Sequence, residues 1–205
     1  MDTEKIYSKF GAYYIADEIT FLMGIDIRFT DHLARRMINR VVLETCTGGG
    51  FSTISLAKYA KHVYTVDIDG LRLNDAKKNA QIAGIDNKIT FINNDVLSKE
   101  VIKLLPEIDA AFLDPDWAVT GIDHEYRFVN SNTRPPSDKL LNFILLRTPN
   151  VTLIQPPFIN PEEFRQLPQH ECERLFLDGR HELFCLHFGD LAKIIGDSEY
   201  MIITK

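Results

Sequence analysis

The hydrophobic positions alternate between two spacings along much of the chain. Short runs rich in Val, Ile and Leu are separated by longer stretches in which apolar residues recur every three or four positions. The expected strands cover residues 41–43, 63–66, 89–92, 109–113 and 151–154. Strands that alternate with helices of about 10–15 residues predict βαβ units and therefore a parallel sheet.

The pattern changes towards the end of the chain. Residues 171–177 and 182–188 flank Asp178-Gly179, a dipeptide that favours the tight turn of a β-hairpin. We therefore expect the parallel sheet to end in an antiparallel hairpin, with residues 200–204 as a further edge strand. The predicted fold class is α/β, with helices flanking a mostly parallel sheet.

Residues 1–40 differ from the rest because aromatic side chains crowd a short amphipathic segment. At helical spacing, such residues favour packing against a core over ligand binding. Thr30 is expected to cap a helix that runs to about Asn39. We predict an N-terminal helical addition at residues 1–40, packed on a core domain at residues 41–205.

The composition excludes several classes of protein. The 205 residues are 45% hydrophobic and 25% charged, as in ordinary globular domains, and no apolar run approaches the ~20 residues of a membrane span. The start, MDTEKIYSKF, lacks the pattern of a secretory signal, so a cytoplasmic protein is expected. Cys46, Cys172 and Cys185 have no CxxC spacing, which argues against a disulfide framework and a metal site. The net charge of −6 disfavours tight nucleic-acid binding by bulk electrostatics.

The strongest local motif runs from Glu44 to Gly50, with the sequence ETCTGGG, between an expected strand and an expected helix. Glycines at the carboxyl end of a strand allow a ligand to approach the backbone at the edge where open α/β sheets bind their ligands. The motif lacks the GK[ST] of a phosphate-binding loop and the spaced third glycine of a dinucleotide fold. Glu44 suits an ammonium group better than a pyrophosphate. The alternative is a tight strand-to-helix turn with no ligand.

Acidic residues follow the next two expected strands. Asp67, 23 residues after Glu44, is placed to accept both hydroxyls of a ribose, whereas Asp69 is assigned to capping the helix that follows. Asn94-Asp95 follows the third strand along the same sheet edge, where an acid can accept an adenine amino hydrogen. These positions favour a ligand that contains a nucleoside.

The segment Asp114-Pro115-Asp116-Trp117 ends the fourth expected strand. A carboxylate beside a carbonyl fixed by proline can accept both hydrogens of an exocyclic amino group, which leaves the nitrogen lone pair directed at an electrophile. Trp117 is the only tryptophan in the chain and offers a face on which a base can stack. The alternative is a solvated turn with a partly buried Trp.

Together these motifs resemble those of class I S-adenosylmethionine-dependent methyltransferases. The run VDIDGLRLNDAKKNAQIAGIDNKITFINNDVL at 66–97, the tryptophan form of the motif at 114–117 and CLHFGDL at 185–191 are most similar to the trimethylguanosine synthase family. Those enzymes methylate the N2 amino group of a 7-methylguanosine RNA cap, and a lone domain such as this resembles prokaryotic members. The resemblance implies a Rossmann-like, seven-stranded class I methyltransferase sheet, S-adenosylmethionine as cofactor, and guanine N2 of RNA as acceptor.

The resemblance also implies roles for individual residues. Asp114, Pro115, Asp116 and Trp117 would be catalytic, with Asp114 and the Pro115 carbonyl holding the amine and Trp117 stacking the base. The implied cofactor-binding residues are Thr30, Glu44, Thr45, Cys46, Gly48, Gly50, Asp67, Ile68, Asn94, Asp95, Val96 and Asp114. We expect an RNA substrate that is weakly held, a partner protein as one source of RNA affinity, and neither a metal nor a membrane.

Two departures from the family pattern leave alternatives open. Asp116 replaces the second proline of the motif, and Ala118-Val119 replace the usual glycine pair after the tryptophan. One alternative keeps the cofactor but changes the acceptor to a protein side-chain amide or a DNA adenine, because motifs of this type serve both. Another is a cofactor-binding partner subunit without activity, because Asp116 breaks the motif.

Overall fold

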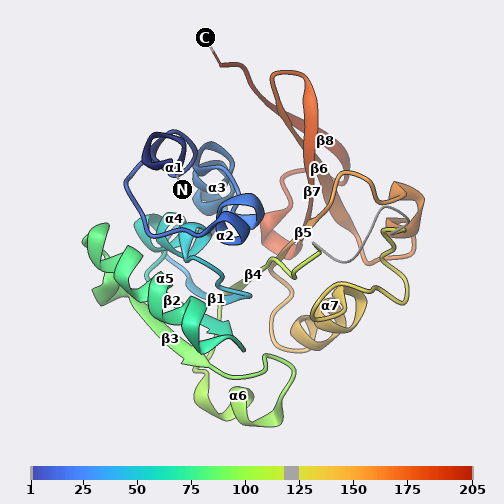
Figure 1. The fold of residues 1–205 in the computed structure, drawn as a ribbon. Coiled ribbons are helices and arrows are strands. Elements are labelled where there is room, and N and C mark those ends of the chain that lie inside the picture. The colour runs from blue at the N-terminus through green and yellow to red at the C-terminus, as the bar shows by residue number, and fades with distance from the viewer. Residues whose placement is uncertain (1, 118–124, 205) are drawn as a thin grey trace. The chain divides into compact units, whose positions relative to one another are not determined.

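The computed structural model describes residues 2–117 and 125–204 (Figure 1). The chain divides into two compact units, Met1–Ala110 and Ala111–Lys205. The described residues contain eight strands, one more than the seven expected, and the helices alternate with strands as an α/β fold requires. The eighth strand is the last one, which joins the terminal hairpin and overlaps the further edge strand expected at residues 200–204.

Three short helices open the first unit: α1 (Thr3–Phe10), α2 (Glu18–Met23) and α3 (Ile27–Ala34), followed by the 3₁₀ turn η1 (Arg35–Met37). Each α-helix begins after an aspartate, Asp2, Asp17 or Asp26, whose carboxylate accepts a backbone N–H of the first turn. Such a cap stabilises a helix by about 1 kcal/mol. The prediction that Thr30 caps a helix to Asn39 is wrong, because Asp26 is the cap and Thr30 lies inside α3.

The first unit contains a parallel sheet in the order β3-β2-β1, formed by β1 (Val41–Thr45), β2 (His62–Asp67) and β3 (Ile89–Asn93). The connections are α4 (Phe51–Tyr59) after β1, α5 (Gly70–Ile82) with η2 (Asp86–Lys88) after β2, and α6 (Lys99–Leu104) after β3. Thr45 lies beside Val66, and Val66 beside Ile92. The predicted βαβ arrangement is confirmed here, and the carboxyl ends of the three strands share one edge.

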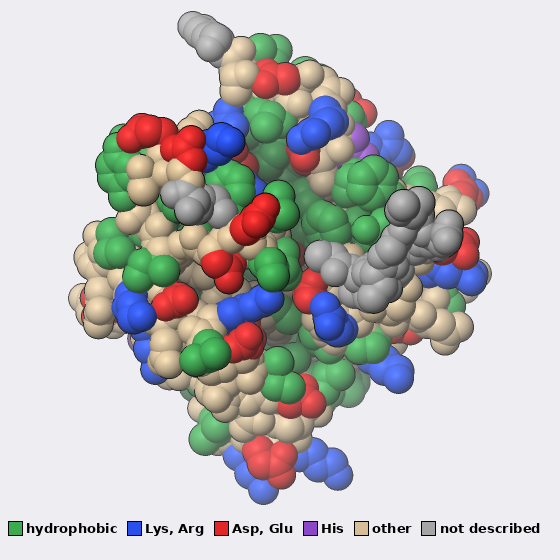
Figure 2. All heavy atoms as spheres, in the orientation of Figure 1, with side chains coloured by type: hydrophobic (Ala, Val, Ile, Leu, Met, Phe, Trp, Pro, Cys, Tyr) green, Lys and Arg blue, Asp and Glu red, His purple; other side chains and the backbone are tan. Residues whose placement is uncertain are grey.

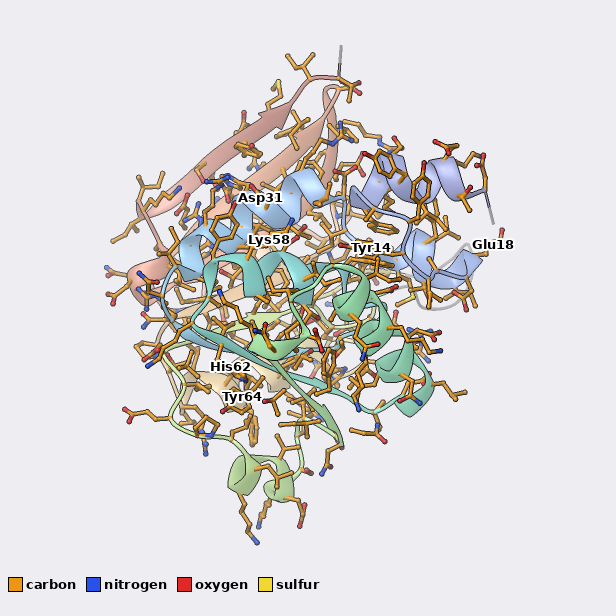
Figure 3. All side chains as sticks on the ribbon, turned by 90° about the vertical axis from the view of Figure 1, so that its left-hand side faces the viewer. Tyr14, Glu18, Asp31, Lys58, His62 and Tyr64 are labelled. Atoms are coloured by element: carbon orange, nitrogen blue, oxygen red, sulfur yellow. The ribbon has the colours of Figure 1, made fainter. Side chains whose placement is uncertain are left out.

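The segment before β1 packs against α4. The ring of Phe10 stacks on that of Phe51, with centroids 3.7 Å apart, a contact that contributes about 0.5–1.5 kcal/mol beyond its buried area. Asp31 of α3 and Lys58 of α4 lie on neighbouring helices (Figure 3). Asp31 accepts a 2.7 Å hydrogen bond from the hydroxyl of Tyr59, which joins the ends of the same two helices.

The second unit holds strands in the order β4-β5-β7-β6-β8. They are β4 (Ala110–Leu113), which starts at the last residue of the first unit, β5 (Val151–Gln155), β6 (His170–Leu177), β7 (Arg180–Phe188) and β8 (Gly196–Ile202). Helix α7 (Ser137–Leu145) precedes β5, η3 (Pro161–Phe164) follows it, and η4 (Gly189–Leu191) follows β7. β4 and β5 pair in parallel, whereas β7 pairs antiparallel with β5 and β6.

The antiparallel hairpin predicted from the sequence is β6 and β7, drawn in orange and red in Figure 1. Its turn residues Asp178 and Gly179 both have positive φ, 50° and 81°, as the tight hairpin turn requires. β8 pairs in parallel with β6 and starts before the expected edge strand. The hydroxyl of Ser198 donates a 2.7 Å hydrogen bond to the buried carboxylate of Glu171, which fixes β8 on β6.

Candidate functional site

Asp67 lies at the carboxyl end of β2 and holds the glycine segment that follows β1. Its Oδ2 accepts the backbone N–H of Gly48 at 2.9 Å, and its Oδ1 accepts that of Asp69 at 2.8 Å. Burial is the main reason why the pKa of Asp67 lies above its ordinary value. Each carboxylate oxygen has a second lone pair, so Asp67 can accept two further donors, such as the vicinal hydroxyls of a ribose.

The loop after Asp67 is held by two more side chains. Asp69 accepts the N–H groups of Leu71 and Arg72, which confirms the predicted cap of α5. Asn93, at the end of β3, donates its side-chain amide hydrogens to the carbonyls of Asp67 and Ile68 at 2.9 and 3.0 Å. Asn93 was not predicted as a site residue, because only the Asn94-Asp95 pair that follows it was identified in the sequence.

Two glycines of the segment after β1 have positive φ angles and different surroundings. Gly48 has a φ of 53°, and, apart from its two chain neighbours, no described residue has an atom within 4 Å of a Cβ placed on it. Gly50 has a φ of 78° and approaches α5 so closely that a Cβ would lie 2.9 Å from that of Ala76. Gly50 is therefore needed for packing, whereas Gly48 leaves open backbone that a ligand can contact.

Glu44 lies beneath this segment in a buried network of hydroxyl groups. The side chain is 1% exposed, and its Oε2 accepts hydrogen bonds from the hydroxyls of Thr53 and Thr65. Thr65 Oγ1 also lies within hydrogen-bonding distance of Thr47 Oγ1. The network ties β1, β2 and α4 to the glycine segment, so the structure gives Glu44 a clear part in holding the loop.

Asn79 of α5 is a further buried residue that the sequence analysis missed. It is 0% exposed, and its amide hydrogens go to the carbonyls of Ile15 and Gly49, both at 2.9 Å. Its oxygen accepts the N–H of Ile15 at 2.7 Å. One side chain thus joins the N-terminal segment to the glycine segment. An Asn on the apolar face of a helix was the signal available in the sequence.

Three further residues of the first unit were predicted to bind the cofactor, and they differ in burial: Thr30 and Thr45 are buried, whereas Cys46 is only partly buried. Thr30 is 2% exposed, and its hydroxyl lies 2.8 Å from that of Ser55. Thr45 is also buried, and among the described residues its hydroxyl has no hydrogen-bond partner. Cys46 is only partly buried and has a φ of 63°, so the backbone already turns at this position. Binding by these three residues stays a prediction.

The segment after β3 forms a turn. Asn94 donates its backbone N–H to the carbonyl of Asp67 at 3.1 Å, which places it beside the proposed ribose acid. The side chain of Asp95 accepts the N–H of Leu97 at 2.9 Å. Val96 is buried and closes the turn against the core. The contact between Asp95 and an adenine stays a prediction.

Asp114 and Pro115 follow β4 in the second unit. Burial, assisted by the negative charge of Asp116, raises the pKa of Asp114 to about 7. Pro115 is buried and fixes the backbone at this point. A carboxyl group that titrates near neutrality can exist as an acceptor of hydrogen bonds and can also take up a proton.

Asp116 pairs with Arg134 across the long connection of the second unit. The two residues exchange backbone hydrogen bonds of 2.9 and 2.8 Å, and an Arg134 guanidinium nitrogen lies 2.9 Å from Asp116 Oδ2. The carboxylate is therefore directed into an ion pair. The departure of Asp116 from the family pattern was visible in the sequence, but its pairing with Arg134 was not predicted.

Trp117 begins a row of aromatic side chains. Its ring lies 6.4 Å from that of Tyr126 in an edge-on arrangement, and Tyr126 lies 5.7 Å from Phe158. Phe158 is 73% exposed, so the row reaches solvent. Ala118-Val119, which replace the family's glycine pair, lie outside the described residues.

Each unit therefore carries one set of predicted residues, those from Thr30 to Val96 in the first and those from Asp114 to Trp117 in the second. Within 2–117 and 125–204, no group of three or more His, Cys, Asp or Glu side chains is arranged to hold a metal ion. None of the helices in these ranges has the length and apolarity needed to cross a bilayer.

Solved structures of methyltransferases share this fold. A putative methyltransferase from Porphyromonas gingivalis W83 superposes with a TM-score of 0.71 at 14% identity, over 94% of this chain and 48% of its own. The 16S rRNA N2 G1207 methyltransferase RsmC from T. thermophilus, solved with AdoMet and guanosine, gives a TM-score of 0.56 at 18% identity, over 85% of this chain and 43% of its own. The protein therefore has the Rossmann-like fold of class I methyltransferases.

Sequence similarity defines the family. Residues 39–166 match the family described as RNA cap guanine-N2 methyltransferase. An uncharacterized RNA methyltransferase from Fusobacterium nucleatum is 35% identical over 97 residues, which cover 46% of this chain and 20% of that protein. The chain belongs to the RNA cap guanine-N2 methyltransferase family, which confirms the resemblance inferred from the sequence. The matched regions span between a fifth and about half of the relatives' own lengths.

Proposed function

We propose that this protein transfers a methyl group from S-adenosylmethionine to the exocyclic N2 amino group of a guanine in RNA. The observation that carries the proposal is Asp114, a carboxyl group with a pKa raised to about 7, followed by Pro115 and Trp117. These residues lie in the part of the chain that matches the RNA cap guanine-N2 methyltransferase family.

The first unit has the groups that this cofactor needs. When bound, S-adenosylmethionine supplies an electrophilic methyl group on a sulfonium. Asp67 has lone pairs for the ribose hydroxyls, and Gly48 has open backbone at the neighbouring loop. Glu44 acts through its network with Thr65, which keeps the glycine segment in place. Asp95 and Val96 would lie against the adenine.

The second unit has the groups that an exocyclic amine needs. Asp114 accepts one hydrogen of the guanine N2 amine and the Pro115 carbonyl accepts the other, so the nitrogen lone pair is directed outwards. Holding the amine in such an orientation can supply roughly 7–11 kcal/mol towards the barrier. As the new N–C bond forms, the bond between the methyl group and sulfur would break and leave a neutral thioether, so the nitrogen becomes cationic and must lose a proton. Asp114, with a pKa of about 7, can accept that proton and release it to water.

The pairing of Asp116 bears on the alternative of an inactive subunit. That alternative rests on Asp116 as a break in the motif. Arg134 gives this aspartate a defined structural partner through its backbone and its side chain. A residue integrated in this way favours an intact acceptor segment over a decayed one.

The charge distribution supports weak RNA binding. On the face drawn in Figure 2, Lys and Arg side chains are interspersed with Asp and Glu side chains. Arg28 and Arg35 form ion pairs with Asp26 and Asp31, and Arg134 pairs with Asp116 in the same way. We propose that a partner protein contributes to RNA affinity. A cytoplasmic location and the role of residues 1–40 as an addition to a domain at 41–205 remain predictions.

The proposal is tested with two RNA oligonucleotides that differ at one base. One contains guanine and the other inosine, which lacks only the amino group on C2. With labelled S-adenosylmethionine, the protein is expected to label the guanine RNA and not the inosine RNA. Equal labelling of both, or labelling confined to adenine-containing DNA or to protein, would overturn the assignment of guanine N2.

A further inference from the structure

We infer that Gln155 determines base specificity: its side-chain carbonyl accepts the N1–H of the guanine that is methylated. The inference rests on the proposed function, since it concerns the same acceptor base. Gln155 is the last residue of β5 and precedes Pro156-Pro157-Phe158. Gln155 was not among the residues predicted from the sequence.

The side-chain amide of Gln155 is buried, and only its NH₂ group takes part in hydrogen bonds among the described residues. The residue is 0% exposed, and its Nε2 donates to Ser137 Oγ at 2.9 Å and to the Ile154 carbonyl at 2.7 Å. Both amide hydrogens are thereby consumed, and a reversed amide would place two carbonyl oxygens against each other. Among the described residues, Gln155 Oε1 has no hydrogen-bond partner. A buried carbonyl without a donor is costly, which favours a ligand that supplies one.

The position of Gln155 places it beside the acceptor segment. β4 and β5 are parallel neighbours, with Leu113 beside Leu153. The acceptor segment starts directly after Leu113, and Gln155 lies two residues after Leu153. Both therefore lie at the carboxyl edge of the same strand pair, which is where open α/β sheets bind ligands.

Hydrogen bonds connect Gln155 to the loop that holds Asp116. Ser137 Oγ, which accepts from Gln155, lies 2.8 Å from Thr133 Oγ1. Thr133 directly precedes Arg134, the partner of Asp116. The amide of Gln155 is thus fixed by the same segment that braces the acceptor motif.

The residues after Gln155 support a base at this place. Phe158 is exposed and its ring lies 5.7 Å from that of Tyr126, which in turn neighbours Trp117. Aromatic rings of this kind are surfaces on which bases stack. The end of β5 therefore has a buried hydrogen-bond acceptor three residues before Phe158, a member of this aromatic row.

Guanine is the base that this acceptor fits. It carries the N1–H beside the N2 amino group, whereas N1 of adenine is itself an acceptor. Gln155 Oε1 would accept a hydrogen bond from the N1–H of guanine and would repel the N1 lone pair of adenine. A site that pairs a buried polar group with one base rejects the base that leaves it unpaired.

The test compares guanine with 2-aminopurine at one position of an RNA oligonucleotide. 2-Aminopurine keeps the amino group on C2 but has no N1–H. The wild type is expected to prefer guanine by about tenfold or more in kcat/KM. In Gln155→Leu this preference should fall towards one, because Oε1 both accepts the N1–H of guanine and repels the acceptor N1 of 2-aminopurine. Gln81→Leu, the same change at an exposed glutamine of α5, is the matched control and should keep the preference.

A role in packing alone would lower both rates equally and leave the preference unchanged, and that result would overturn the inference. Thermal unfolding and binding of S-adenosylhomocysteine check that Gln155→Leu is folded. If Gln155→Leu does not fold, Gln155→Met replaces it in the same comparison. A wild-type preference near one also overturns the inference, whatever the variants do. A wild type that methylates neither RNA overturns the proposed function instead.

Discussion

Asp116 donates its backbone N–H to the carbonyl of Arg134 at 2.9 Å and accepts the Arg134 N–H at 2.8 Å. The side chains of the same two residues form an ion pair of 2.9 Å. The family pattern has proline at this position, and proline has no N–H to donate. This chain therefore fixes its acceptor segment by a two-residue bridge where the motif ordinarily uses a rigid ring.

Restoring the family proline is expected to damage the protein. Asp116→Pro removes the N–H that bonds to the Arg134 carbonyl and the ion pair with it, so turnover should fall. Asp116→Asn keeps the backbone bonds, and it should cost less than about 1 kcal/mol of stability because the Arg134 side chain is exposed. Initial rates and chemical unfolding measure both effects. Higher turnover in Asp116→Pro than in the wild type would show that the site has decayed.

Asp114 predicts a pH dependence of activity. Its pKa of about 7 means that the carboxylate, which accepts one of the two amine hydrogens, forms as the pH rises through neutrality. The value of kcat/KM should therefore rise between about pH 6 and pH 8. Asp114→Asn should remove this rise and lower turnover. A flat profile in the wild type would argue against Asp114 as the titrating group.

The contribution of Asp114 to the free energy of unfolding should fall as the pH rises, whereas kcat/KM should rise. Because the pKa of Asp114 is raised above its ordinary value of 3.8 to about 7, the folded state binds the proton more tightly than the unfolded state. The contribution of this group to stability is complete at low pH and is lost as the pH rises through that window. Asp114→Asn, which is neutral throughout, should raise Tm at pH 8 more than at pH 4.

Asp67 predicts the strength of cofactor binding. Asp67→Ala removes a charged hydrogen-bond acceptor, and it also leaves the Gly48 N–H without its carboxylate. Losing such a bond costs roughly 1.5–3 kcal/mol, so affinity for S-adenosylhomocysteine should fall about tenfold to a hundredfold. Isothermal titration calorimetry measures the affinity of the wild type and of Asp67→Ala for S-adenosylhomocysteine. Asp75→Ala, which removes an exposed carboxylate from α5, is the control and should bind as the wild type does. Equal binding by both variants would refute the ribose contact.

Substitution of Trp117 should affect binding of the acceptor RNA but not binding of the cofactor. Trp117→Ala should leave the affinity for S-adenosylhomocysteine nearly unchanged, because the residue is assigned to the base. RNA binding should weaken by the stacking contribution, about 1–3 kcal/mol per base. Trp117→Phe keeps an aromatic face and should retain most of the affinity. Equal RNA affinity in the wild type and Trp117→Ala would contradict the stacking role.

The sequence predicted the features that are encoded locally. The order of strand, glycine segment and acid is a contiguous pattern, so the positions of Gly48 and Asp67 followed from it. The pairing of Asn79 with Ile15 and that of Arg134 with Asp116 were not predicted, because the partners lie 64 and 18 residues apart and no local pattern specifies such pairings. Thr30 was misassigned as a cap because Asp26, four residues earlier, suits the same role.

The central claim is methylation of guanine N2, and mass spectrometry of nucleosides from cellular RNA tests it most directly. RNA is compared between cells that carry the gene, cells that lack it, and cells complemented with the wild type or with Asp114→Asn. We predict that N2-methylguanosine falls on deletion and is restored by the wild type but not by Asp114→Asn. Unchanged N2-methylguanosine, with loss of a different methylated nucleoside or of none, would contradict the account.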